Sequence, residues 1–211
     1  MIINSVTPYN MGWLESKLDN KIIDTLWSYI DNSKKKNNIL GEDIPSNLSL
    51  LDENNYFFDN VITSFIGKYS ESFENIGNSY GITHIHNYCL ISMWGNFQRK
   101  TDFNPLHMHN SVYSFVVFMK IPTKWQEQHS LKHTIATEVG NTPKCSDFEF
   151  AYIDILGGLK THTYLMDKNM EGTMLFFPSR LNHIVYPFFN SNEYRITISG
   201  DISLNTSFSV N

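Results

Sequence analysis

The chain has 211 residues, of which 41% are hydrophobic and 18% are charged, with only 2 cysteines. This length suits one folded domain, and the composition excludes a disordered chain, a collagen-like repeat and a disulfide-stabilised scaffold. Sixteen basic residues against 21 acidic ones give a net charge of −5. Such a balance disfavours binding to the phosphate backbone of a nucleic acid, so we do not expect a nucleic-acid partner.

The cysteines and the N-terminus predict a cytoplasmic protein. Cys89 and Cys145 lie far apart and form no metal-binding spacing, and the first residues show neither the basic stretch nor the apolar run of a signal peptide. The densest apolar run, Val112–Ile121, is short and contains Ser114 and Lys120. We therefore expect no membrane-spanning segment and no membrane partner.

Two amphipathic helices are predicted in the first third of the chain. Between Gly12 and Asn32 apolar residues recur every four positions, which is the pattern of one buried helix face. A second stripe runs from Phe58 to Phe73 and is followed by a Gly-rich stop signal at Gly77–Gly81. The lysine-rich connection between the two stripes is a solvated loop on this interpretation.

After Gly81 the sequence pattern changes to short segments that are rich in β-branched and aromatic residues and are separated by Gly, Pro and Asn clusters. We expect strands at Thr83–Trp94, Ser111–Ile121, Phe148–Leu156, Thr173–Phe177, His183–Pro187 and Glu193–Ile202. A helix with one apolar face must bury it, so the sequence predicts a mainly β (α+β) fold, an antiparallel barrel or jelly roll backed by helices. Residues 1–81 would be the helical support and residues 82–203 the barrel of a single domain spanning 1–211.

The polar stretch Pro122–Asp147 is too long for a hairpin loop. We expect it to be a lid or a substrate-facing insertion.

The placement of histidines indicates a metal site. His107 and His109 are two residues apart, so their rings share one face if the segment is extended. A third candidate, His183, follows a predicted strand and a turn. Because a jelly roll brings sequence-distant strands together at one mouth, a pair plus a distant histidine predicts a three-ligand facial site.

Other histidines fit a metal site less well. His84 and His86 also alternate, but no separate distant partner accompanies them. His129 and His133 have the i, i+4 spacing of a helical metal pair without the surrounding pattern of a metalloprotease helix. These four are interpreted as surface or packing histidines.

An arginine follows the third histidine by twelve residues. Arg195 lies in an alternating strand and shares a face with Thr197 and Ser199. A guanidinium directed into a barrel requires a carboxylate or phosphate partner, because an unpaired buried charge is costly. The position of Arg195 after a histidine-bearing strand favours an anion-binding role over an outward-facing one.

Four segments together resemble a known family, the 2-oxoglutarate/iron(II)-dependent oxygenases, and more narrowly the small members found in marine bacteria and their phages. They are Asn104–His109, Ser114–Phe118, Glu171–His183 and Arg195–Ser199. The similarity covers roughly residues 93–202, and its most specific part is the E-G-x-x-x-x-F-P-x-x-x-x-H block followed by an arginine strand.

The resemblance implies a double-stranded β-helix, a jelly-roll barrel, with iron(II) and 2-oxoglutarate as its metal and cosubstrate. It puts His107 at the first ligand position and His183 at the last, with Arg195 gripping the distal carboxylate of 2-oxoglutarate and Thr197 as a hydroxyl partner. His109 stands where the family pattern has Asp or Glu, so it is either a third ligand, which we expect, or turns away and leaves a water in its place.

Two further residues are weaker candidates for cosubstrate contacts. Asn96 belongs to a W-x-N stretch that resembles this subgroup, and Tyr88 shares its strand parity with Trp94. Ordinary core packing or turn capping explains Asn96 and Tyr88 at least as well.

The implied reaction converts 2-oxoglutarate and O₂ to succinate and CO₂ while oxidising a small-molecule or protein side-chain substrate, usually by hydroxylation. A cupin-type metalloprotein and a catalytically inactive jelly-roll module remain as alternatives. Against the cupin pattern, Arg180 stands where its second motif has Gly.

Overall fold

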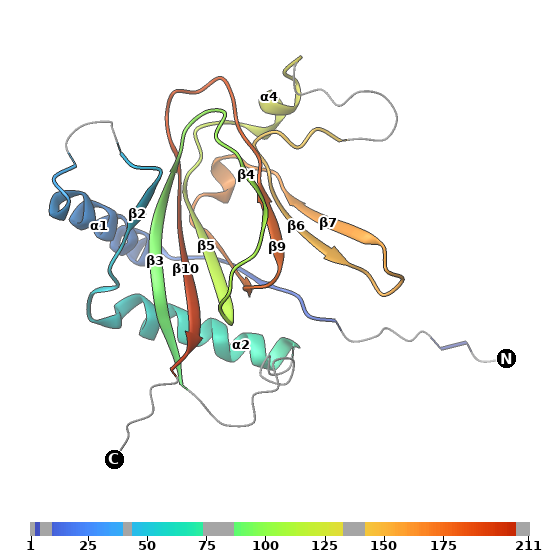
Figure 1. Cartoon of the computed structure of the whole chain (residues 1–211), viewed down its shortest axis with the longest axis horizontal. Coiled ribbons are helices and arrows are strands. Elements are labelled where there is room, and N and C mark those ends of the chain that lie inside the picture. The colour runs from blue at the N-terminus through green and yellow to red at the C-terminus, as the bar shows by residue number, and fades with distance from the viewer. Residues whose placement is uncertain (1–2, 5–9, 40–43, 74–86, 133–141, 206–211) are drawn as a thin grey trace.

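The computed structural model describes residues 3–4, 10–39, 44–73, 87–132 and 142–205. Its larger sheet contains β1 (Leu14–Lys17), β2 (Asn47–Ser49), β3 (Tyr88–Gln98), β5 (Tyr113–Lys120), β8 (Thr173–Pro178) and β10 (Arg195–Leu204). Its smaller sheet contains β4 (Asn104–His107), β6 (Phe148–Ile153), β7 (Leu159–Tyr164) and β9 (Asn182–Val185). The strand orders are β1-β8-β5-β10-β3-β2 and β4-β9-β6-β7, and the strand pairs are antiparallel. Figure 1 shows β4 and β9 lying across from β3, β10 and β5.

Two longer helices come from the first third of the chain, as predicted, but the first begins later than its apolar stripe. Leu14 lies in β1, opposite Phe176 of β8, and α1 spans Asn20–Lys36. The boundary lies at Asp19, whose side chain accepts a hydrogen bond from the Ile22 N–H at 2.9 Å and caps the helix. The expected helical start at Gly12 is therefore wrong, because a strand with period two can carry the same apolar residues.

The second apolar stripe forms a π-helical turn at Phe58–Ile62 that continues into α2 (Thr63–Phe73). The Asp52 carboxylate accepts hydrogen bonds from the N–H groups of Phe57 and Phe58, both at 2.8 Å, and so starts this element. Three shorter helical turns are Glu53–Asn55, α4 (Trp125–His129) and Lys168–Met170.

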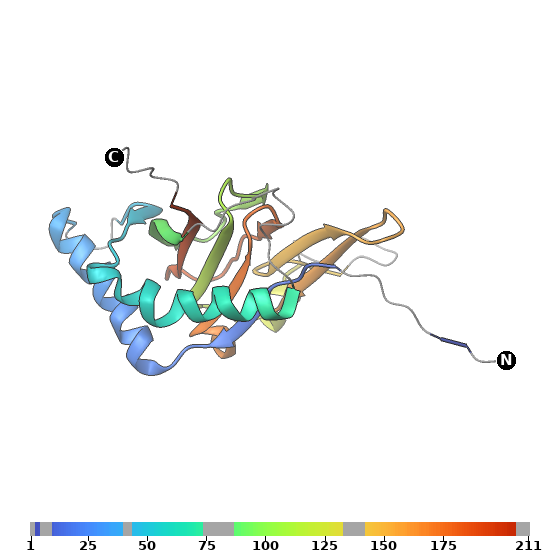
Figure 2. The ribbon, with the colours of Figure 1, turned by 90° about the horizontal axis from the view of Figure 1, so that it is seen from below.

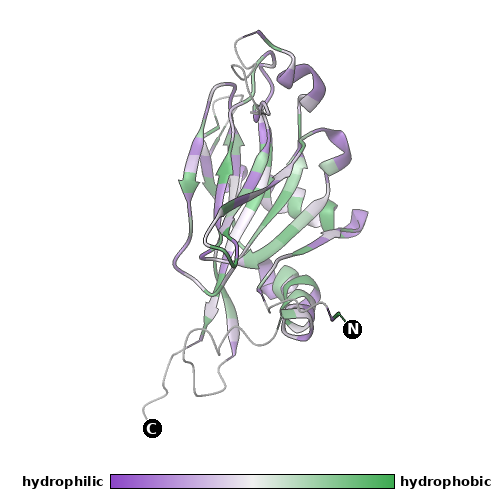
Figure 3. Ribbon diagram, turned by 90° about the vertical axis from the view of Figure 1, so that its right-hand side faces the viewer, coloured by the Kyte–Doolittle hydropathy of each residue, from purple (hydrophilic) through white to green (hydrophobic). Residues whose placement is uncertain are grey.

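Helices α1 and α2 lie on one side of the larger sheet (Figures 1 and 2). One hydrophobic cluster joins their buried faces to the sheet, with Leu26, Ile30, Ile62 and Tyr69 from the helices and Phe97, Phe115, Phe176 and Ile198 from the strands. Figure 3 shows hydrophobic residues concentrated on these interior strands. The N-terminal part is therefore not a purely helical support, because its strands β1 and β2 join the larger sheet. The hydrophobic cluster anchors this part of the chain to the sheet.

A second hydrophobic cluster fills the space between the two sheets. It packs on the face of the larger sheet that points away from the helices. In β5, Phe115 and Val117 face the helices, whereas Val116 and Phe118 belong to the cluster between the sheets. Because both faces of β5 are covered, nearly all of its residues are buried and the strand shows no polar alternation. The two sheets and this interior form the predicted jelly-roll barrel.

Each of the six predicted strand segments overlaps an observed strand, and four strands of the described chain, β1, β2, β4 and β7, were not predicted. β7 is largely exposed, so it lacks the apolar alternation on which the prediction depends. The predicted segment Phe148–Leu156 ends early, because the Asp154 carboxylate accepts hydrogen bonds from the N–H groups of Leu156 and Gly158 at 2.9 and 2.8 Å and closes a hairpin turn.

Several sequence features fall outside the described residues. These are His84, His86 and His133, the stop signal at 77–81, and residues 133–141 of the predicted insertion. Where it is described, that insertion contains α4. In the described parts of the chain, no helix is long and apolar enough to cross a membrane.

Candidate metal and cosubstrate site

The three predicted histidines meet between the sheets. The pairing of β4 with β9 sets His107 directly opposite His183, and His109 lies two residues beyond the end of β4. One ligand atom from each of the three rings lies within 4.8 Å of the others. The ring centroids of His107 and His183 are 4.1 Å apart, and that of His109 is 5.5 Å and 5.3 Å from them. A single metal ion can therefore contact all three.

Each ring uses its Nδ1 atom for another partner. His107 Nδ1 is 2.7 Å from the Pro105 carbonyl oxygen, His183 Nδ1 is 3.0 Å from that of Leu181, and His109 Nδ1 is 2.9 Å from Asp201 Oδ1. All three partners are acceptors, so Nδ1 carries the proton and the lone pair remains on Nε2. This arrangement orients metal-ligating histidines in proteins.

The protonation of two of the rings also suits a metal. Burial lowers the pKa of His183 to about 3, and burial lowers the pKa of His107 as well. The neutral imidazole, the form that binds metals, therefore predominates at these positions near neutral pH. The Asn104 side-chain nitrogen approaches His107 Nε2 at 3.4 Å, which is longer than an ordinary hydrogen bond. Three nitrogen donors of this kind fit a divalent first-row metal such as iron(II).

The histidines open into a cavity of about 450 Å³. Its lining combines apolar side chains with polar groups, as is typical of a small-molecule site. The polar members are Trp94, Asn96, Gln98, Arg195, Thr197 and Ser199 from β3 and β10, together with Ser46, Asn47, Asp102 and Asn104, and the apolar ones include Phe118, Phe148, Phe177 and Val185.

Arg195 is a buried cation that faces this cavity. Its Nε and Nη2 atoms donate to Gln98 Oε1 at 2.8 and 2.5 Å, Nη2 also donates to the Tyr186 carbonyl at 2.8 Å, and Nη1 donates to the Ser146 carbonyl at 2.5 Å. Burial lowers the pKa of Arg195 to about 10, so the guanidinium stays charged near neutral pH. In the part of the chain that the structure describes, none of its hydrogen-bond acceptors is a carboxylate.

The pairing of β3 with β10 arranges the remaining polar groups in a ladder. Arg195 lies opposite Gln98, Thr197 opposite Asn96, and Ser199 opposite Trp94. The Asn96 side chain donates to the Thr197 hydroxyl at 3.1 Å and to the Ser199 hydroxyl at 3.2 Å. The predicted residues Asn96, Thr197 and Arg195 therefore lie on one face of the larger sheet and line the same cavity as the histidines.

Comparison with known proteins identifies the fold and the chemistry. A family model described as "Putative 2OG-Fe(II) oxygenase", where 2OG is 2-oxoglutarate, matches residues 92–201, which is more than half of the chain. The chain belongs to this family. It is therefore a 2-oxoglutarate- and iron(II)-dependent oxygenase. The matched span covers most of the barrel and contains all three clustered histidines and Arg195.

A solved structure shows the same fold at low sequence identity. A 2OG-Fe(II) oxygenase family oxidoreductase from Burkholderia pseudomallei aligns with a TM-score of 0.51 and 12% identity over 89% of this chain and 80% of its own. A prolyl-4-hydroxylase from Pseudomonas putida aligns with a TM-score of 0.49 and 12% identity over 90% and 91%. The sequence matches no curated protein significantly.

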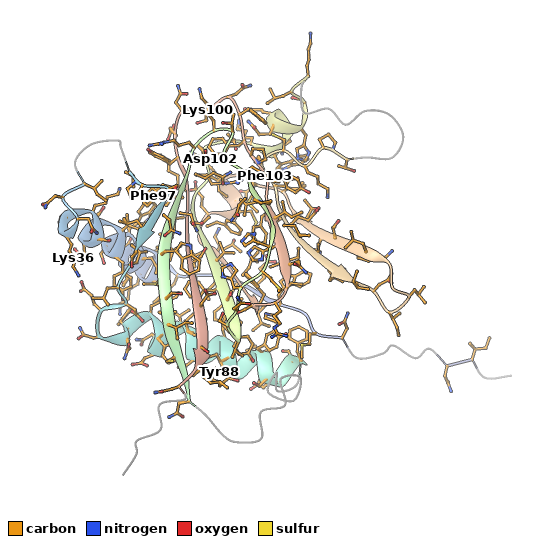
Figure 4. All side chains as sticks on the ribbon, in the orientation of Figure 1. Lys36, Tyr88, Phe97, Lys100, Asp102 and Phe103 are labelled. Carbon is orange, nitrogen blue, oxygen red and sulfur yellow. The ribbon has the colours of Figure 1, made fainter. Side chains whose placement is uncertain are left out.

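Tyr88 is the predicted site residue that the structure does not bring to the oxygenase cavity. Along β10 and β3 the register shifts after Asp201, which pairs with Ser92 while Ile202 pairs with Leu90. This irregularity reverses the strand parity, so Tyr88 packs against the cluster on the helix side. Figure 4 shows Tyr88 at the opposite end of β3 from Asp102 and Phe103, which line the cavity.

The sequence analysis missed Gln98 and Asp201, the cavity-side partners of Arg195 and His109. Asp201 Oδ1 lies against His109 Nδ1 and also accepts a hydrogen bond from the Ser114 hydroxyl at 2.6 Å. Burial opposes ionisation of Asp201, but the hydrogen bonds from His109 and Ser114 outweigh it and lower its pKa. Strand parity could have identified Asp201, because it lies six residues after Arg195 and therefore on the same face of the strand.

Proposed function

We propose that His107, His109 and His183 hold the iron(II) of this oxygenase, and that Arg195 binds the distal carboxylate of 2-oxoglutarate. Thr197 and Asn96 assist as polar contacts along the cosubstrate. The oxidised substrate is a small molecule or a protein side chain, and hydroxylation is the reaction. The free thiols Cys89 and Cys145 support a cytoplasmic location, that of the host if the gene is carried by a phage.

The observation that carries this proposal is the buried guanidinium of Arg195 in the same cavity as the three histidines. All its hydrogen-bond acceptors in the described chain are neutral oxygens, so its charge lacks an anionic partner. The carboxyl group of Asp147 acts on it only through space, and burial raises the pKa of that group to about 7. A dicarboxylate that enters the cavity supplies the missing charge.

Each part of the chain has a distinct task in this proposal. The imidazoles orient the metal through Nε2, and the Arg195 end of the β3–β10 ladder orients the cosubstrate. The Trp94 ring stacks on His109 with 5.7 Å between centroids and 17° between planes, which restricts that ligand. Phe148 and Phe177 contact His183 with their rings and exclude water from it. Bound iron(II) supplies the redox chemistry that couples 2-oxoglutarate decarboxylation to substrate oxidation.

The test is formation of succinate from 2-oxoglutarate by the purified protein with iron(II), first without any added substrate. Uncoupled turnover is expected in the parent and should be lost in His107→Ala and His183→Ala. His162→Ala is the matched control, because His162 lies on β7 and is not among the cavity-lining residues. Full turnover in either ligand variant would contradict the ligand assignment, and no turnover in the parent would favour an inactive module.

A further inference from the structure

A carboxylate stands directly behind one of the three clustered histidines. Asp201, on β10, places Oδ1 at 2.9 Å from His109 Nδ1, and both side chains are only 17% exposed. The Nε2 atom of the same ring is the one left for a metal. His109 therefore links the carboxylate on one side of its ring to the proposed ligand position on the other.

Resting on the proposed function, we propose that Asp201 is the positioning carboxylate of this metal centre. It keeps the proton on His109 Nδ1 and supplies, from behind the ring, negative charge to a site whose three direct ligands are all neutral. A hydrogen bond from a ligating imidazole to a carboxylate fixes the orientation of the ring and raises the basicity of the nitrogen that meets the metal. His109 thus binds as a stronger donor than a histidine paired with a carbonyl group.

The surroundings hold Asp201 in this position. Ser114 Oγ is 2.6 Å from Asp201 Oδ1 and 2.9 Å from Ser179 Oγ, which is 2.5 Å from Ser111 Oγ. A hydroxyl has only one proton and a carboxylate only accepts, so Ser114 donates to Asp201 and leaves its oxygen free to accept from Ser179. The Ser111 proton goes either to Ser179 or to the Tyr113 carbonyl oxygen, which is 3.2 Å from Ser111 Oγ. All three serines are buried. The chain of hydroxyls therefore ends on Asp201 and favours its charged form.

The same cluster also holds the backbone of His109. The His109 N–H donates to the Ser179 carbonyl oxygen at 2.8 Å. The histidine is thus held at its backbone by Ser179, at Nδ1 by Asp201 and on its ring face by Trp94. Among the described residues, the partners of the other two rings at Nδ1 are backbone carbonyl groups. Asp201 is therefore the only one of the three Nδ1 partners that carries a full charge.

The experiment measures binding of cobalt(II) alone to the metal-free protein, by calorimetry and by the visible absorption of the bound ion. In Asp201→Asn the side chain keeps its shape and can still accept the Nδ1 hydrogen bond, but the charge is lost. We expect the dissociation constant for cobalt(II) to rise about 10- to 100-fold, the usual effect of losing such an outer partner, with a changed cobalt(II) spectrum.

Asp147→Asn is the matched control. Asp147 Oδ2 lies 2.9 Å from His129 Nε2, so this variant makes the same chemical change at another buried carboxylate–imidazole pair, one outside the proposed ligand set. Its cobalt(II) affinity should stay within about twofold of the parent. Thermal unfolding of the metal-free variants shows whether either substitution acts through stability alone.

The outcomes separate the two proposals. If His107→Ala and His183→Ala lose cobalt(II) while Asp201→Asn binds it as tightly and with the same spectrum as the parent, the role of Asp201 is refuted and the metal centre stands. Failure of the parent to bind cobalt(II) overturns both.

Discussion

Replacing Arg195 with lysine tests the cosubstrate site while keeping its charge. The guanidinium makes four hydrogen bonds to three partners, Gln98, Tyr186 and Ser146, which a single ammonium group cannot reproduce in the same plane. Lysine therefore retains the attraction for a carboxylate and loses the fixed planar donors of the guanidinium. Alanine would instead leave buried carbonyl groups unpaired, at about 1–3 kcal/mol each, and so confuse binding with stability.

The size of the effect follows from the strength of that contact. A hydrogen bond to a charged group contributes roughly 1.5–3 kcal/mol, and each 1.4 kcal/mol is a factor of about ten in an equilibrium constant. Arg195→Lys should therefore raise the apparent Michaelis constant for 2-oxoglutarate about ten- to hundredfold. The affinity for iron(II) or cobalt(II) should be nearly unchanged, because Arg195 is not among the three clustered ligand residues.

The assay is the 2-oxoglutarate dependence of succinate formation, together with calorimetric binding of 2-oxoglutarate to the metal-loaded protein without oxygen. Arg180→Lys, the same substitution at an exposed arginine, is the control. If Arg195→Lys and the uncharged Arg195→Met both leave the 2-oxoglutarate dependence within about twofold of the parent, the reasoning about the buried cation is refuted.

Four further predictions concern the site and the fold. Gln98→Glu should form an ion pair with Arg195 and weaken 2-oxoglutarate binding about tenfold or more, as measured by calorimetry, whereas tighter binding would contradict this. His109→Ala should weaken cobalt(II) binding about tenfold or more, and an unchanged titration would remove His109 from the ligand set. Burial lowers the pKa of His183 to about 3, from 6.5 in the unfolded chain. Between about pH 3 and pH 6.5 the unfolded chain therefore binds a proton at this ring that the folded chain does not, so the free energy of unfolding decreases as the pH falls below about 6.5. As the pH falls from about 6.5 to 5, the free energy of unfolding of metal-free His183→Gln should thus rise by about 2 kcal/mol relative to that of the parent, as measured by urea unfolding with a chelator. A difference in unfolding free energy that does not change with pH would refute the buried neutral ring. Finally, a chain of residues 82–211 should show no cooperative unfolding, because it lacks α1 and α2, which cover the larger sheet, and β1 and β2, which form the two edges of that sheet.

Local patterns predicted the strands that line the interior and the residues that meet there. The alternation along β10 places Arg195, Thr197 and Ser199 on one face, and all three line the cavity. His107 and His183 were expected to converge, and the pairing of β4 with β9 sets them opposite each other. These inferences succeeded because strand parity is a local property of the backbone.

The same local reasoning failed where a distant contact decides. Leu14 fits the helical stripe, yet pairing with β8 makes it part of a strand. Tyr88 shares its sequence parity with Trp94, but a register shift between β3 and β10 sends it to the other face. Both outcomes depend on hydrogen bonds to a partner strand far along the chain, which no spacing within one segment reveals.

The sequence by itself indicated a metal site through the histidine spacing and an anion-binding cation through the arginine strand, and its resemblance to the 2-oxoglutarate/iron(II)-dependent oxygenases implied the type of chemistry. Only the tertiary structure decided how those groups are held. Gln98 meets Arg195 across 97 positions of sequence, and Asp201 meets His109 across 92. The first pair arises because β3 and β10 are neighbours in one sheet, and the second because the two sheets face each other. Neither arrangement can be inferred from the local sequence around one residue of the pair.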